Sequence, residues 1–163
     1  MNISANLFVI SAPSGAGKTT LVKKLISRNK QLKYSVSYTT RTPRKNEIDG
    51  HDYFFVSIDE FNHLKNQKAF IEHANVFGNL YATSEEQVKN ILKDNHHVIL
   101  EIDWQGAQQV RKSMPQCISI FILPPSQELL NKRLVNRATD TREIIERRLN
   151  EALDDMSHWN EFD

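Results

Sequence analysis

The sequence predicts an α/β protein in which helices flank a parallel sheet. Three short apolar runs support this prediction: residues 7–10, 98–100 and 117–123. Each run is bounded by turn residues and has the length of a buried strand. Because segments with helical periodicity alternate with these runs, the strands are expected to lie parallel in one sheet.

The first strand leads into a loop and then a helix. Residues 7–10 are followed by Ser11-Ala12-Pro13-Ser14-Gly15-Ala16-Gly17, and a helix is expected from about Lys18. Four residues at helical spacing form the predicted apolar face of that helix: Leu21, Val22, Leu25 and Ile26.

The loop has the residues of a phosphate-binding loop, G-x-x-x-x-G-K-[ST]. Its glycines let backbone N–H groups surround phosphate oxygens at a helix N-terminus, Lys18 would neutralise the β- and γ-phosphates, and Thr19 would ligate Mg²⁺. The pattern departs at its first position, where Ala12 replaces glycine. The competing interpretation is an ordinary strand-to-helix turn, which the flanking strand and helix disfavour.

Between the first two core strands the pattern changes. Alternating polarity over 34–38, 53–56 and 69–82 predicts antiparallel strands that form a smaller inserted lobe. Capping boxes at Ser57–Glu60 and Ser84–Gln87 predict helix starts.

The C-terminal part of the chain is predicted to be helical. Helices are expected from Ser126 to about Arg137 and from Thr141 to about His158.

Composition excludes several classes of protein. The chain has 163 residues and a mass of 18.9 kDa, which fits one domain. Its 21 basic and 20 acidic residues give a net charge of +1, so no basic field for nucleic acid is expected. A single cysteine, the absence of an apolar run long enough for a bilayer, and the lack of a secretory signal predict a cytoplasmic protein without a membrane partner. The sequence leaves homo-oligomerisation open.

The turn 39–44 carries Arg41 and Arg44 beside threonine hydroxyls, and guanidinium forks suit phosphate oxygens. Tyr53 and Tyr81 could donate to the same phosphate. Taken alone, the turn could equally be a solvated basic surface, and the tyrosines half-buried sheet residues.

Five segments in order resemble guanylate kinase: 11–19, 36–44, 50–53, 70–72 and 100–106. The resemblance extends from Leu7 to Phe162 and implies a P-loop NTPase-type fold with a substrate-binding insert and a helical lid. It implies phosphoryl transfer from ATP to GMP, giving ADP and GDP, in purine nucleotide metabolism and GMP recycling. ATP and Mg²⁺ are the implied cofactors.

The resemblance assigns roles to residues of this chain. Around guanine it places Ser37, Glu72, Thr83, Glu101 and Asp103. On the GMP phosphate it places Arg41, Arg44, Tyr53 and Tyr81. On ATP it places Ser14, Gly15, Ala16, Gly17, Lys18, Thr19, Thr20, Arg133 and Arg137, with Thr19 on Mg²⁺. The catalytic set is Lys18, Arg44, Arg137 and Arg148.

Guanine chemistry supports the assignment of Glu72. Guanine N1–H and N2–H₂ are adjacent donors that one carboxylate can accept, whereas adenine lacks this edge. Without the other segments, a salt-bridged strand residue would be the better interpretation of Glu72. Glu101 and Asp103 share one face at the carboxyl end of a strand, where ligands bind in such sheets. Either could serve the metal.

The resemblance implies one domain with three parts. The core covers about 1–33, 84–126 and 149–163, the GMP-binding insert about 34–83, and the lid about 127–148. Ala138 stands where the family has glycine, which predicts a stiffer lid hinge. The family continues beyond Asp163 with a strand, an Asn-Asp pair and a helix, so we expect the natural product to be longer.

Two alternatives belong to other classes. One is a non-catalytic guanylate-kinase-like binding module, which the intact phosphate loop and both arginines of the turn argue against. The other is a related P-loop kinase acting on a sugar phosphate, which Glu72 together with Ser37 argues against.

Overall fold

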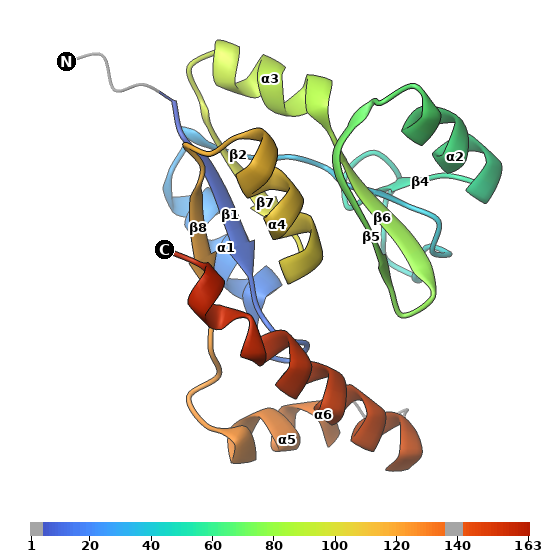
Figure 1. Ribbon diagram of the computed structural model, residues 1–163, viewed down its shortest axis with the longest axis vertical. Coiled ribbons are helices and arrows are strands. Elements are labelled where there is room, and N and C mark those ends of the chain that lie inside the picture. The colour runs from blue at the N-terminus through green and yellow to red at the C-terminus, as the bar shows by residue number, and fades with distance from the viewer. Residues whose placement is uncertain (1–4, 136–141) are drawn as a thin grey trace.

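The computed structural model describes residues 5–135 and 142–163, and the side chains of 142–145 and 147 are outside that description. The predicted α/β core is present: a parallel sheet has helices on both faces (Figure 1). In spatial order its strands are β2 (Leu32–Tyr34), β7 (His97–Glu101), β1 (Leu7–Ser11) and β8 (Ile118–Phe121).

Alternation along the strands decides which helix covers which face. Leu7, Val9, Val98 and Leu100 pack under α3 (Glu85–Lys93) and α4 (Trp104–Ser113), in a cluster that includes Val88 and Val110. On the other face, Ile10 and Ile99 contact Val22 of α1 (Lys18–Arg28). Successive strand residues point to opposite faces, so one apolar run serves two helical layers.

The apolar face predicted for α1 is narrower than expected. Val22 is 1% exposed, whereas Leu21 and Leu25 are 42% and 39% exposed. Of the four residues on the predicted apolar face, Val22 is therefore the one that is fully buried. A helix on a sheet of only four strands buries one stripe, and the flanking leucines lie at its margin.

A second sheet forms the inserted lobe. Its spatial order is β4 (Phe54–Phe55), β3 (Tyr38–Thr39), β6 (Asn79–Ser84) and β5 (Phe70–Val76), with α2 (Ile58–Asn66) beside it. The predicted helix starts are confirmed, since Ser57 Oγ accepts from Glu60 N and Ser84 Oγ from Gln87 N.

Two expectations about this lobe were wrong. Residues 34–38 do not form one strand of the insert: Tyr34 ends β2, which pairs in parallel with β7 in the core sheet, and only Tyr38–Thr39 form β3. In addition, β4 pairs in parallel with β3, so the lobe is mixed rather than antiparallel.

The lobe is attached to the core through α4. The Gln109 side chain bonds the backbone of His73 on β5 in both directions, accepting from N at 3.1 Å and donating to O at 2.8 Å. This contact holds the insert close to the carboxyl ends of the core strands.

The C-terminal helices α5 (Gln127–Val135) and α6 (Arg142–Ser157) lie beyond the phosphate loop and precede a short 3₁₀ turn at Trp159–Glu161 (Figure 1). Leu130, Leu134 and Ala152 form their shared core. No helix within the described ranges has the length and apolar character needed to cross a membrane.

Candidate active site

The loop between β1 and α1 has the backbone of a phosphate cradle. Gly15 and Gly17 have φ values of +87° and +97°, which side-chain-bearing residues rarely adopt. Ala16 N donates to Pro13 O at 3.1 Å and closes the turn. A Cβ on Gly15 would lie 3.1 Å from Leu134, so α5 also packs closely on the loop.

Lys18 is the first residue of α1, and its side chain reaches the backbone just after the neighbouring strand β7. Its Nζ donates to the carbonyl of Ile102 at 3.0 Å, and Ser11 Oγ donates to the same oxygen at 2.9 Å. Burial lowers the pKa of Lys18, while Glu101, Asp103 and Asp155 act in the opposite direction. The ammonium group is therefore held among carboxylates at the carboxyl edge of the sheet.

The structure separates the two carboxylates that the sequence left equivalent. Thr19 Oγ1 donates to a carboxylate oxygen of Glu101. Asp103 instead caps α4, accepting from Gly106 N at 2.9 Å and from the Gln105 amide at 3.1 Å. Glu101 is thus the carboxylate beside the threonine hydroxyl of the phosphate loop.

A cavity of about 480 Å³ opens over the loop. Its wall includes Ser14, Lys18 and Thr20 of the loop and helix start, Arg44 of the turn, and Asp103. From α6 come three acidic residues: Glu151, Asp154 and Asp155.

Asp155 was missed at the sequence level. Burial, then the charge of Asp103, raises its pKa to about 6, and Lys18 opposes this rise. The helical periodicity of the sequence around Asp155 gives no sign that this residue lies beside the phosphate loop, because only the packing of α6 against the loop places it there.

Glu72 is a buried carboxylate at the junction of lobe and core. It is 3% exposed and accepts from Thr83 Oγ1 at 2.6 Å, and Ser37 is also buried. Burial raises the pKa of Glu72 from 4.5 to about 7, with Thr83 and Lys18 acting against the rise and Asp103 with it. A ligand with two adjacent N–H donors would satisfy this carboxylate.

The position of the Glu72 carboxylate requires a glycine at residue 106. A Cβ there would lie 2.5 Å from Glu72 Oε2. The residue belongs to the segment 100–106, but its role was missed because a close approach across two elements leaves no local pattern.

The aromatic residues expected on a phosphate gather around Arg41. The Arg41 Cζ lies 5.4 Å from the Tyr53 ring centroid, and the rings of Tyr53 and Tyr81 are 6.0 Å apart. Burial raises the pKa of Tyr53 to about 12, so its hydroxyl remains a donor at neutral pH. Arg41, Tyr53 and Tyr81 are thus brought together as the sequence predicts.

Arg44 lies between two cavities. It lines the one over the phosphate loop and a second of about 600 Å³, which also reaches Thr19, Tyr53 and Glu101. Its position connects the expected GMP phosphate to the expected ATP phosphates.

Of the arginines predicted for the lid and ATP site, the structure describes Arg133 and Arg148. Arg133 Nη1 donates to Ala16 O of the phosphate loop at 3.0 Å. Arg148 lies on α6. Arg137 and Ala138 lie outside the described residues, so the predictions for the lid hinge and for Arg137 are not addressed.

Fold and site together are those of a P-loop phosphotransferase with an inserted lobe beside the phosphate loop. The guanylate kinase family profile matches residues 4–163. The chain is 54% identical to a guanylate kinase of Alkalilimnicola ehrlichii over 157 residues, which are 96% of this chain and 77% of that protein. It is 51% identical to one of Hydrogenovibrio crunogenus over 161 residues, 99% of this chain and 78% of the relative.

A solved structure agrees with these matches. The crystal structure of guanylate kinase from Anaplasma phagocytophilum superposes with a TM-score of 0.78 at 34% identity, covering 98% of this chain and 74% of that one. This chain belongs to the guanylate kinase family. Its activity is accordingly phosphoryl transfer from ATP to GMP, and neither the non-catalytic module nor the sugar-phosphate kinase is favoured.

Proposed function

We propose that this reaction runs in the cleft between the phosphate loop and the inserted lobe, with GMP on the lobe and ATP on the loop. The observation that carries the proposal is the position of Glu72, a buried carboxylate whose charge interacts with Lys18 of the loop. A carboxylate for a nucleobase and a cation for a phosphate thus lie close enough to interact electrostatically.

On the ATP side, Ser14 to Thr20 would surround the phosphates with backbone N–H groups. Lys18 would exchange the carbonyl of Ile102 for phosphate oxygens, because an anionic acceptor forms a stronger hydrogen bond than a neutral one. Arg133, already at the Ala16 carbonyl, would lie beside the same phosphates.

Mg²⁺ fits the residues present. Magnesium takes hard oxygen ligands and is commonly held by one or two carboxylates together with substrate phosphates. The hydrogen-bonded Thr19 hydroxyl and Glu101 carboxylate supply such oxygens. Within the part of the chain that is described, no group of three His, Cys, Asp or Glu residues forms a metal site. When bound, the ion would neutralise charge on the transferred phosphoryl group.

On the GMP side, Glu72 would accept N1–H and N2–H₂ of guanine, and Ser37 or Thr83 would serve O6. Arg41, Tyr53 and Tyr81 would hold the phosphate, and Arg44 would reach toward the transferred group. Asp103, engaged in capping α4, would contribute its charge at the base side rather than at the metal.

No general base is needed. The attacking oxygen belongs to the GMP phosphate, which is ionised at neutral pH, so positioning and charge neutralisation suffice. Lys18, Arg44, Arg137 and Arg148 are the cations that we assign to this task.

An acceptor panel tests the proposal. Purified protein is given ATP and Mg²⁺ with GMP, AMP, UMP or a ribose bisphosphate, and ADP release is followed by a coupled assay. GMP should be the preferred acceptor by orders of magnitude. Equal use of the ribose bisphosphate would remove guanine recognition, and no turnover with any acceptor would favour a binding module.

We further propose a cytoplasmic location. ATP and GMP are available there, and Cys117 is a free, buried thiol, as proteins of reducing compartments commonly contain.

A further inference from the structure

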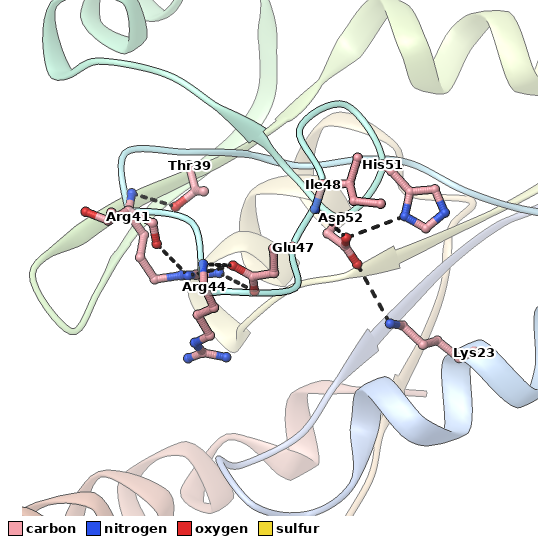
Figure 2. Close-up of polar contacts among 9 residues, drawn as sticks. Lys23, Thr39, Arg41, Arg44, Glu47, Ile48, His51 and Asp52 are labelled. Atoms are coloured by element: carbon pink, nitrogen blue, oxygen red, sulfur yellow. Dashed lines mark hydrogen bonds and ion pairs between the residues drawn. The ribbon is translucent and has the colours of Figure 1, made fainter. Parts of the chain in front are cut away.

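Glu47 holds the turn that carries both phosphate-binding arginines. Its carboxylate accepts from Arg41 Nη1 at 2.9 Å and from Arg41 Nη2 at 2.8 Å, and also from the backbone N–H of Arg44 at 2.7 Å (Figure 2). The two side chains are only 15% and 17% exposed, so this is a half-buried, bidentate ion pair. Such pairs fix geometry as well as charge.

The contacts of Arg41 leave one edge of its guanidinium for a ligand. A guanidinium has five N–H groups, and on the described turn three of them reach acceptors, two on Glu47 and one on Thr42 O at 2.8 Å. The remaining two, on Nε and Nη2, lie side by side and form a second fork. A phosphate can accept both.

Aromatic residues fix the plane of the same group. The rings of Tyr53 and Phe55 lie 5.4 and 5.7 Å from Arg41 Cζ. Arg41 is therefore held at one end by Glu47 and from the side by aromatic rings.

The Arg44 side chain behaves differently. Glu47 binds only its backbone N–H, and the guanidinium points away from Glu47 (Figure 2). It extends to the wall shared by the two cavities. One carboxylate thus orients Arg41 through its side chain and Arg44 through its backbone.

We propose that Glu47 is a positioning residue for the GMP phosphate, which presents the free fork of Arg41 and directs Arg44 into the cleft. The proposal rests on the function proposed above for the two arginines. The opposite interpretation is that Glu47 imitates the phosphate and must leave before GMP binds. The contact with Arg44 N argues against it, since departure would also strip the turn of this hydrogen bond.

The charges of Glu47 and Arg41 support the interpretation that Glu47 stays in place when GMP binds. The Arg41 guanidinium and the Arg44 N–H hold the pKa of Glu47 below its usual range, and Glu47 in turn raises the pKa of Arg41. The pair therefore stays ionised throughout the pH range of an assay.

The test is Glu47→Gln, with Glu60→Gln as the matched control, because Glu60 is an exposed glutamate of the same lobe. An amide offers Arg41 one acceptor where the carboxylate offers two. We expect KM for GMP to rise on the order of 10- to 100-fold, the range for hydrogen bonds to charged groups. KM for ATP should change less than about twofold, and the control should match the wild type. Unchanged or lowered KM for GMP would overturn the proposal, and a lowered value is what the phosphate-mimic interpretation requires.

Three further variants separate the possible failures. In an Arg41→Ala background, Glu47→Gln should raise KM for GMP by less than about threefold, because the amide oxygen can still accept from Arg44 N and the effect that acts through Arg41 is already gone. A full effect in that background would overturn the positioning role. If Arg41→Ala alone left KM for GMP unchanged, the proposed function of Arg41 would fail instead. Glu47→Asp keeps the charge on a shorter side chain and should shift KM for GMP in the same direction by a smaller factor. The thermal unfolding midpoint of each variant verifies folding.

Discussion

Replacing Glu72 with glutamine should stabilise the ligand-free protein against unfolding, by an amount that increases as the pH rises. The same substitution should weaken GMP binding. The folded-state pKa of Glu72 is raised to about 7 from 4.5 because the carboxylate is buried. A raised carboxyl pKa means that the folded state binds the proton more tightly than the unfolded chain. Stability from this group is therefore fully present below about pH 4.5 and is lost as the pH rises to 7.

The size of the loss follows from the shift. At 1.36 kcal/mol per pKa unit, ionising Glu72 in the folded protein costs about 3 kcal/mol, most of it between pH 5 and pH 8. Glutamine has no charge to bury and its carbonyl can still accept from Thr83. The variant should therefore gain about 2–3 kcal/mol relative to the wild type over this range. For GMP the direction reverses, because the amide accepts only one of two guanine donors, a loss of about 1–3 kcal/mol.

Urea denaturation at pH 5, 6, 7 and 8 measures the first effect, and calorimetric titration with GMP measures the second. Glu60→Gln serves as a control, since an exposed glutamate should give a difference from the wild type that does not vary with pH. If the difference between Glu72→Gln and the wild type were equally constant, Glu72 would not carry a buried charge. Unchanged GMP affinity would remove it from the guanine site.

Other variants address the remaining parts of the site. Lys18→Ala should lower kcat by on the order of 100-fold or more and leave the calorimetric Kd for GMP unchanged, since the lost charge acts on the transferred phosphate; normal turnover would refute the phosphate-loop assignment. Gly106→Ala places a Cβ only 2.5 Å from Glu72 Oε2 and so displaces that carboxylate. KM for GMP should therefore rise about tenfold or more while KM for ATP stays unchanged; equal changes in both would point to general misfolding. Removing Mg²⁺ with a chelator should abolish turnover and adding it back should restore it, and activity that survives chelation would exclude the proposed role of Thr19 and Glu101.

Local sequence patterns predicted the phosphate-binding unit well. The run 7–10, the glycines at 15 and 17 and the helix from Lys18 are consecutive, so strand, loop and helix are encoded within about twenty residues. The capping serines at 57 and 84 are similarly local.

Features that depend on contacts between distant segments were missed or misread. β2 is three residues long, and Tyr34 joins the core sheet only because Ile99 of β7 lies beside it. Asp155 acquires its environment from a strand and loop far earlier in the chain. Glu47 was closer to detection, since it follows Arg44 by three residues within one turn, but a charge on a loop is usually solvated.

The selectivity of the chain for GMP over AMP tests the central claim most directly. It is measured as the ratio of kcat/KM for the two acceptors, with ATP saturating, for the wild type and for Glu72→Gln. A buried carboxylate left unpaired by the wrong base should give the wild type a preference of at least about 10³ for GMP, and the variant should lose tenfold or more of that preference. A wild type that uses AMP as well as GMP, or a variant with undiminished selectivity, would contradict the account.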